Sequence, residues 1–388
     1  QPGRGQIFDC RGEGNILAMN LPLKDVCADP SEIYASNRVT DVAVQLSELL
    51  GLGIDEVTVK LSNPRKRFVF LRRYVKEDLA AEIAARKLTG VFLTDSTRRY
   101  YPSQSFMCHV LGFVNYESAG SAGIEQCLDK FLRGSPGVLN SRVNALRQEI
   151  YWQRENLVPA VAGSDVCLTL DQNVQYIVEK ALDEVMDEHH AKGAWAIIQR
   201  IRTGEILAMA SRPGYDLNKF PTADKAAMLN RAIGFVYEPG STFKVVTFSA
   251  AFNENVVRDE QVIHCENGAW TYKGKVLRDY HPYGHLTVAD GLKKSSNILT
   301  AKVALMLGDK RLYDYLKAFG VGNLMHVDLP GEEAGILPPP SKWCSYSATR
   351  LAIGQGVAVT ALQMLGIYGA IANDGYMMKP YVVQRVTS

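Results

Sequence analysis

The stretch EPGSTFKVV, residues 238–246, places a serine directly after Pro-Gly and a lysine three positions later. Pro-Gly favours a turn, and the apolar run that follows predicts a helix over residues 241–253 with Ser241 in its first turn. A hydroxyl at that end of a helix lies near the positive pole of the helix dipole, which favours a developing oxyanion. These features suit a nucleophile at the start of a helix.

Lys244 is the candidate base for this serine. The i to i+3 spacing places it on the same helical face as Ser241. Its neighbours Phe243, Val245 and Val246 predict a buried stem, and burial favours the neutral amine that can accept the serine proton. The alternative is a serine helix cap with a surface lysine nearby, because an S-x-x-K pattern occurs by chance roughly once in a chain of this length.

A second polar motif, KKSSN at residues 293–297, supports the catalytic interpretation. Ser295 lies 54 residues after Ser241, at the end of the helical pattern TVADGLKK. Ser295 and Asn297 bracket one residue, so both side chains can point into one cleft. A serine there can relay a proton to a leaving amine, and an asparagine amide can hold a substrate carbonyl. Taken alone, S-S-N is also a common turn at a helix end.

Composition sets the class of protein. A chain of 388 residues is expected to form two or more domains, and 47% hydrophobic with 22% charged residues is ordinary for a globular protein. A net charge of +2 does not indicate a nucleic-acid partner. The seven cysteines lack C-x-x-C spacing, so we expect unpaired thiols and neither a zinc site nor a disulfide framework. No cofactor is expected.

The ends of the chain and its periodic segments outline the organisation. No window reaches the length of apolar sequence that a membrane span needs, and the start at Gln1 suggests that a signal or an anchor precedes it. A turn-rich boundary at 155–165 predicts domains over 1–160 and 161–388. The second domain should be mixed α/β (α+β), because a strand hairpin over 194–211 precedes mainly helical segments. Helices are expected over residues 41–50, 76–90, 172–193 (capped by Asp171), 241–253, 287–307, 309–318 and 360–373.

Together, S-T-F-K and S-S-N resemble the first two active-site motifs of penicillin-binding proteins and serine β-lactamases. The wider sequence is similar to class B penicillin-binding proteins, the monofunctional peptidoglycan transpeptidases, and most of all to their division-associated (septal) branch. The segments that carry this resemblance run in order along nearly the whole chain: GRGQIFDCRG (3–12), RRYYPSQSFMCHVLGFVN (98–115), GSAGIEQCLDKFLRGSPG (120–137), LTLDQNVQ (168–175), TGEILAMASRPGYDLNKF (203–220), NRAIGFVYEPGSTFK (230–244) and IGQGVAVTALQMLGIYGAIANDG (353–375). Cys10 replaces the arginine usual in the first segment.

The resemblance implies a pedestal domain followed by a penicillin-binding transpeptidase domain, and a role for each motif residue. Ser241 would attack the penultimate D-Ala of a D-Ala-D-Ala stem peptide, with Lys244 as general base. Ser295 would pass the proton to the leaving amine, and Asn297 would orient the lysine and the substrate amide. β-Lactams would acylate Ser241 in the same way. No metal is implied.

The family's third motif, K-T-G or K-S-G, does not occur before Ser388; RTG at 202–204 and LTG at 88–90 lie in a hairpin turn and at a helix end. We therefore expect little activity from this chain, because one oxyanion donor alone contributes about 10²–10³ in rate. By resemblance, the protein would be anchored in the bacterial inner membrane by one N-terminal segment, with its domains facing the periplasm. Its expected partners are a lipid-II glycan polymerase and other cell-division membrane proteins.

Two other functions fit part of the sequence. A serine β-lactamase or D,D-carboxypeptidase shares both motifs, but those compact hydrolases lack the pedestal segments. A non-catalytic sensor or scaffold would explain the missing third motif. Among the remaining polar residues, the pair His189-His190 is expected on the surface, and His281 and His285 are either loop residues or part of the cleft. Glu125 is expected to be structural.

Overall fold

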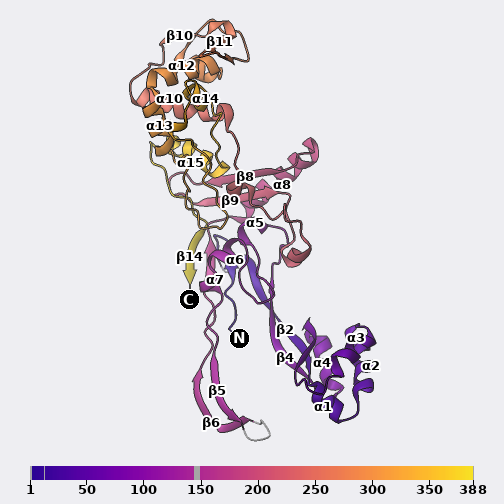
Figure 1. Cartoon of the computed structure of the whole chain (residues 1–388). Helices are drawn as coiled ribbons and strands as arrows, with labels where there is room; N and C mark the ends of the chain where they lie inside the picture. Colours follow the sequence, from indigo (N-terminus) through magenta and orange to yellow (C-terminus); the bar gives the residue numbers. More distant parts are fainter. Residues whose placement is uncertain (1, 13, 144–148, 388) are drawn as a thin grey trace.

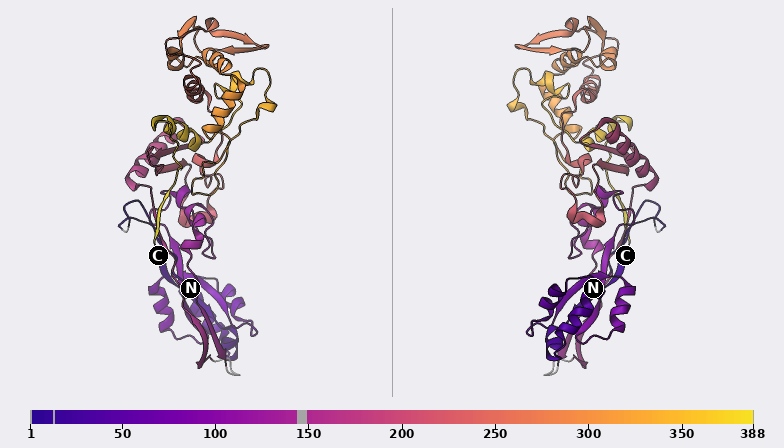
Figure 2. Two further views of the ribbon diagram at one scale, coloured as in Figure 1. Left: turned by 90° about the vertical axis from the view of Figure 1, so that its left-hand side faces the viewer. Right: turned by 90° about the vertical axis from the view of Figure 1, so that its right-hand side faces the viewer.

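The computed structural model describes residues 2–12, 14–143 and 149–387, and the side chains outside 138–157 (Figure 1). Gln1 and Ser388, the two ends of the chain, lie outside the described residues. The molecule is elongated, with a small helical head and a strand hairpin at one end and a large helical lobe at the other (Figures 1 and 2).

A twisted sheet runs through the N-terminal half. Its strand order is β14 (Val383–Thr387), β7 (Asp165–Leu168), β1 (Ile7–Phe8), β2 (Ile16–Ala28) and β3 (Val69–Val75), and β4 (Val91–Tyr100) also pairs with β2. β2 and β4 are antiparallel from Met19–Tyr100 to Ala28–Val91. The sequence alone does not reveal β2, because Pro22 and Lys24 interrupt its alternation.

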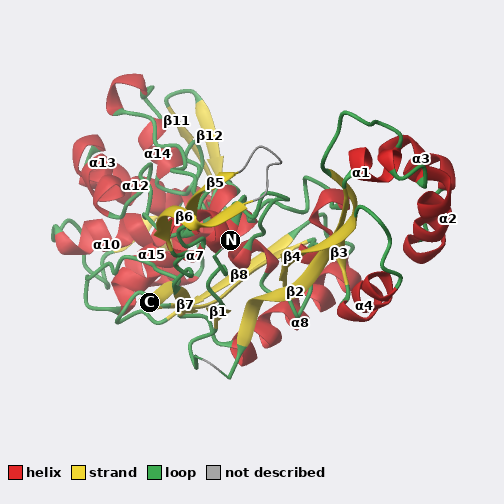
Figure 3. Ribbon diagram, turned by 90° about the horizontal axis from the view of Figure 1, so that it is seen from below, coloured by secondary structure: helices red, strands yellow, loops and turns green. Residues whose placement is uncertain are grey.

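The head consists of four helices at the far end of β2, β3 and β4 (Figure 3). They are α1 (Pro30–Ala35), α2 (Val39–Leu50), α3 (Ile54–Leu61) and α4 (Glu77–Ala85). The prediction of a helix over 41–50 is confirmed, and α2 ends at Gly51, whose φ of 59° allows the left-handed cap. The predicted helix over 76–90 is longer than the one in the structure, because α4 ends at Ala85.

A buried ion cluster joins the start of the chain to the middle of the N-terminal half. Glu125, at 0% exposure, accepts from Arg4 Nε at 2.7 Å and from Arg99 Nε at 2.6 Å. Arg4 also donates to Asp129 Oδ1 at 2.6 Å, and the Tyr101 hydroxyl donates to Glu125 at 3.2 Å. The structural role expected for Glu125 follows from these bonds, because a buried charge must be paired.

Short helices and a hairpin complete this half of the chain. The helices α5 (Cys108–Leu111), α6 (Gly123–Cys127) and α7 (Asp129–Leu132) pack near the sheet, and the hairpin of β5 (Val138–Val143) and β6 (Glu149–Val158) extends beside the head (Figure 1).

The second half begins with α8 (Gln172–His189), which packs against the antiparallel strands β8 (Ala194–Gln199) and β9 (Ile206–Arg212). The expected cap is confirmed, because the Asp171 carboxylate accepts from the amides of Asn173 and Val174. The expected hairpin is confirmed too. After η1 (Leu217–Thr222) and α9 (Arg231–Gly234), the chain enters the helical lobe.

The helical lobe is built around α10 and α12, with small strand pairs above them (Figure 1). Its elements are η2 (Gly240–Phe243), α10 (Lys244–Asn253), β10 (Val262–His264), η3 (Glu266–Gly268), β11 (Ala269–Tyr272), β12 (Lys275–Arg278), β13 (His285–Thr287), α11 (Val288–Lys293), α12 (Asn297–Leu307), α13 (Asp309–Ala318), η4 (Pro340–Lys342), α14 (Ser347–Leu351) and α15 (Ala361–Ala372). The prediction of a single helix over 287–307 is wrong, because the helical conformation is interrupted at Ser295, between α11 and α12. None of the helices in the described ranges is long and apolar enough to cross a membrane.

Candidate active site

Ser241 lies exposed in η2, the single 3-10 turn that leads into α10. The turn rests closely on the loop at Gly354, whose carbonyl accepts from the Gly240 amide at 3.0 Å. A Cβ on Gly354 would lie 2.3 Å from Gly240 O, so only glycine allows this approach. Among the described residues no side chain is hydrogen-bonded to the Ser241 hydroxyl, so backbone packing fixes the position of Ser241.

Lys244 is the first residue of α10, and the residue is 1% exposed. Its amine donates two hydrogen bonds, both to Ser295: one to Oγ at 2.9 Å and one to the backbone oxygen at 2.6 Å. Burial lowers the pKa of Lys244 to about 8, although the charge of Asp279 acts to raise it. A substantial fraction of this amine is therefore neutral at physiological pH, as a general base requires.

Ser295 occupies a strained backbone position. Its φ is 57°, in the left-handed region that a serine rarely adopts. Because of this conformation, α11 ends and α12 begins within three residues, and the Ser295 carbonyl and hydroxyl both turn toward Lys244. Such strain is held only where the surroundings enforce it, and it is found most often at functional sites.

Asp279 is the residue that enforces this geometry, and sequence reasoning missed it. One carboxylate oxygen accepts from the amides of Asn297 at 2.5 Å and Ile298 at 3.0 Å, and the other accepts from Ser296 Oγ at 2.7 Å. Ser296 in turn caps the amide of Leu299. The first amides of α12 are thus satisfied, and a negative charge lies at its positive end. No local pattern links Asp279 to a helix that starts 18 residues later.

Asn297 is the first residue of α12, next to Ser295 and Ser296. Its side-chain amide donates to the backbone oxygen of Arg278 at 2.8 Å. The two hydrogen bonds of the Lys244 amine go to Ser295 and not to Asn297, and the orienting role that the resemblance implies for Asn297 stays a prediction.

None of the histidines is among the hydrogen-bond partners of Lys244 in the described part of the chain. His189 and His190 are exposed at the end of α8, as expected, and His281 and His285 are exposed as well. His109 is buried, its Nε2 lies 2.7 Å from the Ala227 carbonyl, and burial lowers its pKa to about 4. Within the part of the chain that the structure describes, no group of three or more His, Cys, Asp or Glu side chains could hold a metal ion.

An elongated N-terminal half, a helical lobe packed on a strand hairpin, and a buried lysine that lies three positions after the exposed Ser241 and is hydrogen-bonded to Ser295 match the residue types and spacing of a serine–lysine acyl-transfer enzyme. Family models agree with this class. Residues 194–388 match the penicillin-binding protein transpeptidase domain, and residues 1–168 match the penicillin-binding protein dimerisation domain. The chain belongs to the penicillin-binding protein transpeptidase family. The predicted resemblance to class B proteins of the division-associated branch is confirmed.

Among characterised relatives, the chain is 32% identical to the peptidoglycan D,D-transpeptidase FtsI of Escherichia coli (strain K12), over 99% of this chain and 64% of the relative. It is 30% identical to the probable peptidoglycan D,D-transpeptidase PenA of Neisseria meningitidis serogroup A, over 97% of this chain and 64% of the relative. The chain thus spans less than two thirds of the length of these relatives.

Solved structures confirm the predicted mixed α/β fold. A peptidoglycan synthetase from Bifidobacterium adolescentis superposes with a TM-score of 0.78 at 27% identity, covering 100% of this chain and 74% of the other. Penicillin-binding protein 3 from Mycobacterium tuberculosis, complexed with aztreonam, gives a TM-score of 0.71 at 26% identity, covering 99% of this chain and 67% of the other.

Proposed function

We propose that the protein is a serine D,D-transpeptidase that cross-links peptidoglycan stem peptides during septal wall synthesis. The observation that carries the proposal is the buried Lys244 amine, hydrogen-bonded to Ser295 and one helical turn after the exposed Ser241. Membership of the transpeptidase family and the relatives FtsI and PenA support the reaction class.

In the first half-reaction, Ser241 Oγ attacks the carbonyl carbon of the penultimate D-Ala while the neutral Lys244 amine takes the hydroxyl proton. The backbone N–H of Ser241 is one donor to the resulting oxyanion. As the C–N bond breaks, the proton passes from Lys244 through the Ser295 hydroxyl to the leaving D-Ala amine. The 2.9 Å bond between Lys244 Nζ and Ser295 Oγ supports this relay.

In the second half-reaction, an amine from a neighbouring stem peptide attacks the Ser241 ester. Its proton returns by the same route to Ser241 Oγ, which leaves as the new amide forms. Asn297 is proposed to orient the substrate amide at the rim of the site. A β-lactam would open its ring on Ser241 and leave a stable ester, because no amine-bearing fragment departs to make room for the acceptor.

The N-terminal half is proposed to form a pedestal over residues 1–160 that binds partner membrane proteins, among them a lipid-II glycan polymerase, with residues 161–388 as the catalytic domain. The end of β6 at Val158 and the start of β7 at Asp165 support this boundary. By family resemblance, the site would face the periplasm, with an anchor in the inner membrane. Low activity of the 388-residue chain stays a prediction.

The test is a cross-linking assay with D-Ala-D-Ala stem peptides and an amine acceptor, on this chain and on the complete gene product. Wild type, Ser241→Ala and the matched control Ser249→Ala, on the same helical segment, are compared. The proposal expects D-Ala release and cross-linked product to vanish only in Ser241→Ala. Hydrolysis without cross-linking would instead indicate a carboxypeptidase, and rapid β-lactam turnover would indicate a β-lactamase.

A further inference from the structure

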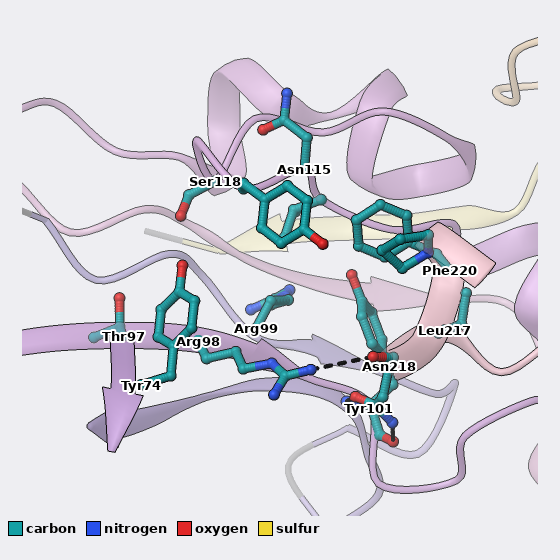
Figure 4. Close-up of a pocket in the computed structure, with 13 residues that line it drawn as sticks. Tyr74, Thr97, Arg98, Arg99, Tyr101, Asn115, Ser118, Leu217, Asn218 and Phe220 are labelled. Atoms are coloured by element: carbon teal, nitrogen blue, oxygen red, sulfur yellow. Dashed lines mark hydrogen bonds between the residues drawn. The ribbon is translucent and has the colours of Figure 1, made fainter. Parts of the chain in front are cut away.

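A cavity whose lining does not include Ser241, Lys244 or Ser295 lies where the N-terminal half meets η1. It has a volume of about 240 Å³, is open to solvent on one side, and is lined by Tyr74 of β3, the end of β4, the segment 114–118 and η1. In Figure 4, Arg99 lies at the centre, with Tyr74, Thr97 and Arg98 on one side and Asn115, Ser118 and Phe220 on the other. Residues of RRYYP (98–102) and of DLNKF (216–220) therefore line the same cavity.

Arg99 lines this cavity, and its guanidinium carries a buried hydrogen-bond donor without a partner among the described residues. Its Nε donates to Glu125 at 2.6 Å and its Nη1 donates to the Gly5 carbonyl at 2.7 Å. The remaining nitrogen, Nη2, is buried and has no partner among the described residues, and the whole residue is only 7% exposed. A buried donor without an acceptor is rare in native proteins and costs free energy, so a ligand acceptor at this point is favoured.

The charge of the lining is positive. Arg99 and Arg4 are balanced by Glu125 and Asp129 in the buried ion cluster. Arg98 is exposed, and within the described part of the chain it donates only to the Asn218 carbonyl, at 3.1 Å; none of the lining residues is an aspartate or a glutamate. One positive charge is therefore left for the cavity, and the planar guanidinium groups of neighbouring arginines favour a carboxylate.

The walls offer flat aromatic faces beside polar groups. Tyr74 has a φ of 60°, held by the bond from its amide to Asp25 at 2.9 Å. Phe220 is stacked on Phe113 with ring centroids 4.3 Å apart, and Tyr116 lies beside it with centroids 6.0 Å apart. Aromatic faces pack against the apolar face of a sugar ring, and nearby hydroxyl and amide groups such as Thr97, Asn115 and Ser118 suit its hydroxyls.

We propose that this cavity binds a sugar acid, that is, one pyranose ring carrying a carboxylate. The carboxylate accepts from Arg98 and from Arg99 Nη2, and the ring packs against Tyr116 and Phe220. The volume suits one monosaccharide, since it lies below the range of about 300–1,000 Å³ found for larger, drug-sized ligands. The proposal rests on the lining residues alone and is independent of the proposed transpeptidase function.

The test is a titration followed by saturation-transfer NMR, with N-acetylmuramic acid as the probe. N-acetylglucosamine is the matched neutral sugar, because it lacks only the 3-O-lactyl group that carries the carboxylate, and inorganic phosphate is the matched small anion. We expect saturable binding of the sugar acid with a Kd below about 1 mM, and binding at least tenfold weaker for both controls.

Arg98→Ala is the informative variant, because Arg98 is exposed and outside the buried ion cluster, whereas a change at Arg99 would disrupt Glu125. It should weaken binding of the sugar acid by roughly tenfold or more, and Tyr116→Ala should weaken it as well. Arg65→Ala, which removes an exposed charge of the head, should leave binding unchanged. No saturable binding, equal binding of either control, or an Arg98→Ala variant that binds like wild type would overturn the proposal.

Discussion

Replacing Asp279 tests whether one carboxylate holds the start of α12 and, through it, Ser295. Asp279→Ala removes the acceptor of two helix amides and of the Ser296 hydroxyl, which lie 2.5, 3.0 and 2.7 Å away. Loss of a single side-chain cap costs about 1 kcal/mol, and hydrogen bonds to a charged group contribute about 1.5–3 kcal/mol. Because Asp279 is half-buried and water can replace part of the loss, we expect a decrease of about 2–4 kcal/mol in the free energy of unfolding.

Asp279→Asn separates hydrogen bonding from charge. The asparagine oxygen can still accept from both amides, so the free energy of unfolding should fall by only about 1 kcal/mol. The negative charge that raises the pKa of Lys244 is lost, so that pKa should move below about 8. The pH at which Ser241 becomes acylated at half its maximal rate should therefore move to lower values in Asp279→Asn.

Urea titrations followed by tryptophan fluorescence measure the first effect, and penicillin acylation rates across pH measure the second. Asp259→Ala is the matched control, because it removes an exposed carboxylate of the same lobe and should change stability by less than about 0.5 kcal/mol. An Asp279→Ala variant as stable as this control would refute the role given to Asp279.

Three further predictions concern the base, the ion cluster and the loop below the nucleophile. Burial lowers the pKa of Lys244 to about 8, and only the neutral amine accepts a proton. The rate of penicillin acylation should therefore rise about tenfold per pH unit below that pKa and level off above it. A rate that does not change between about pH 6 and 9 would contradict this prediction. Glu125→Gln leaves two buried arginines without their shared carboxylate, so the free energy of unfolding measured by urea titration should fall by about 3–5 kcal/mol. A decrease of less than about 1 kcal/mol would mean that the ion cluster is dispensable for stability. Gly354→Ala should slow acylation, because its Cβ would lie 2.3 Å from Gly240 O. The control Gly356→Ala should slow acylation much less, because Gly356 has a φ of 73°, close to the 75° of Gly354, and open space around it. Equal acylation rates in the two variants would exclude the proposed steric role of Gly354.

The sequence was sufficient where the signal is local. The apolar residues around Lys244 predict its burial, which is confirmed, whereas a shared site for Ser241 and Ser295 stays a prediction. The structure adds that the amine is bonded to Ser295. The Asp171 cap is also predicted, because a cap lies next to the helix that it begins.

The features that the sequence did not predict depend on contacts between distant segments. The helical pattern continues through residues 287–307, yet Asp279 and Lys244 stabilise a break at Ser295 that no helix propensity indicates. The donor left over on Arg99 likewise follows from bonds to Gly5 and Glu125, which are remote in sequence. Tertiary contacts thus override the local preference at the positions that matter most for the proposed chemistry.

Intact-mass spectrometry after incubation with a penicillin tests the central claim most directly, on this chain and on the complete gene product, each with Ser241→Ala and Ser249→Ala. The proposed mechanism predicts one adduct of the mass of the drug, mapped by peptide digestion to Ser241, absent in Ser241→Ala and retained in Ser249→Ala. An adduct that persists in Ser241→Ala or maps to another residue, or a complete gene product that does not react, would contradict the assignment of Ser241 as the nucleophile.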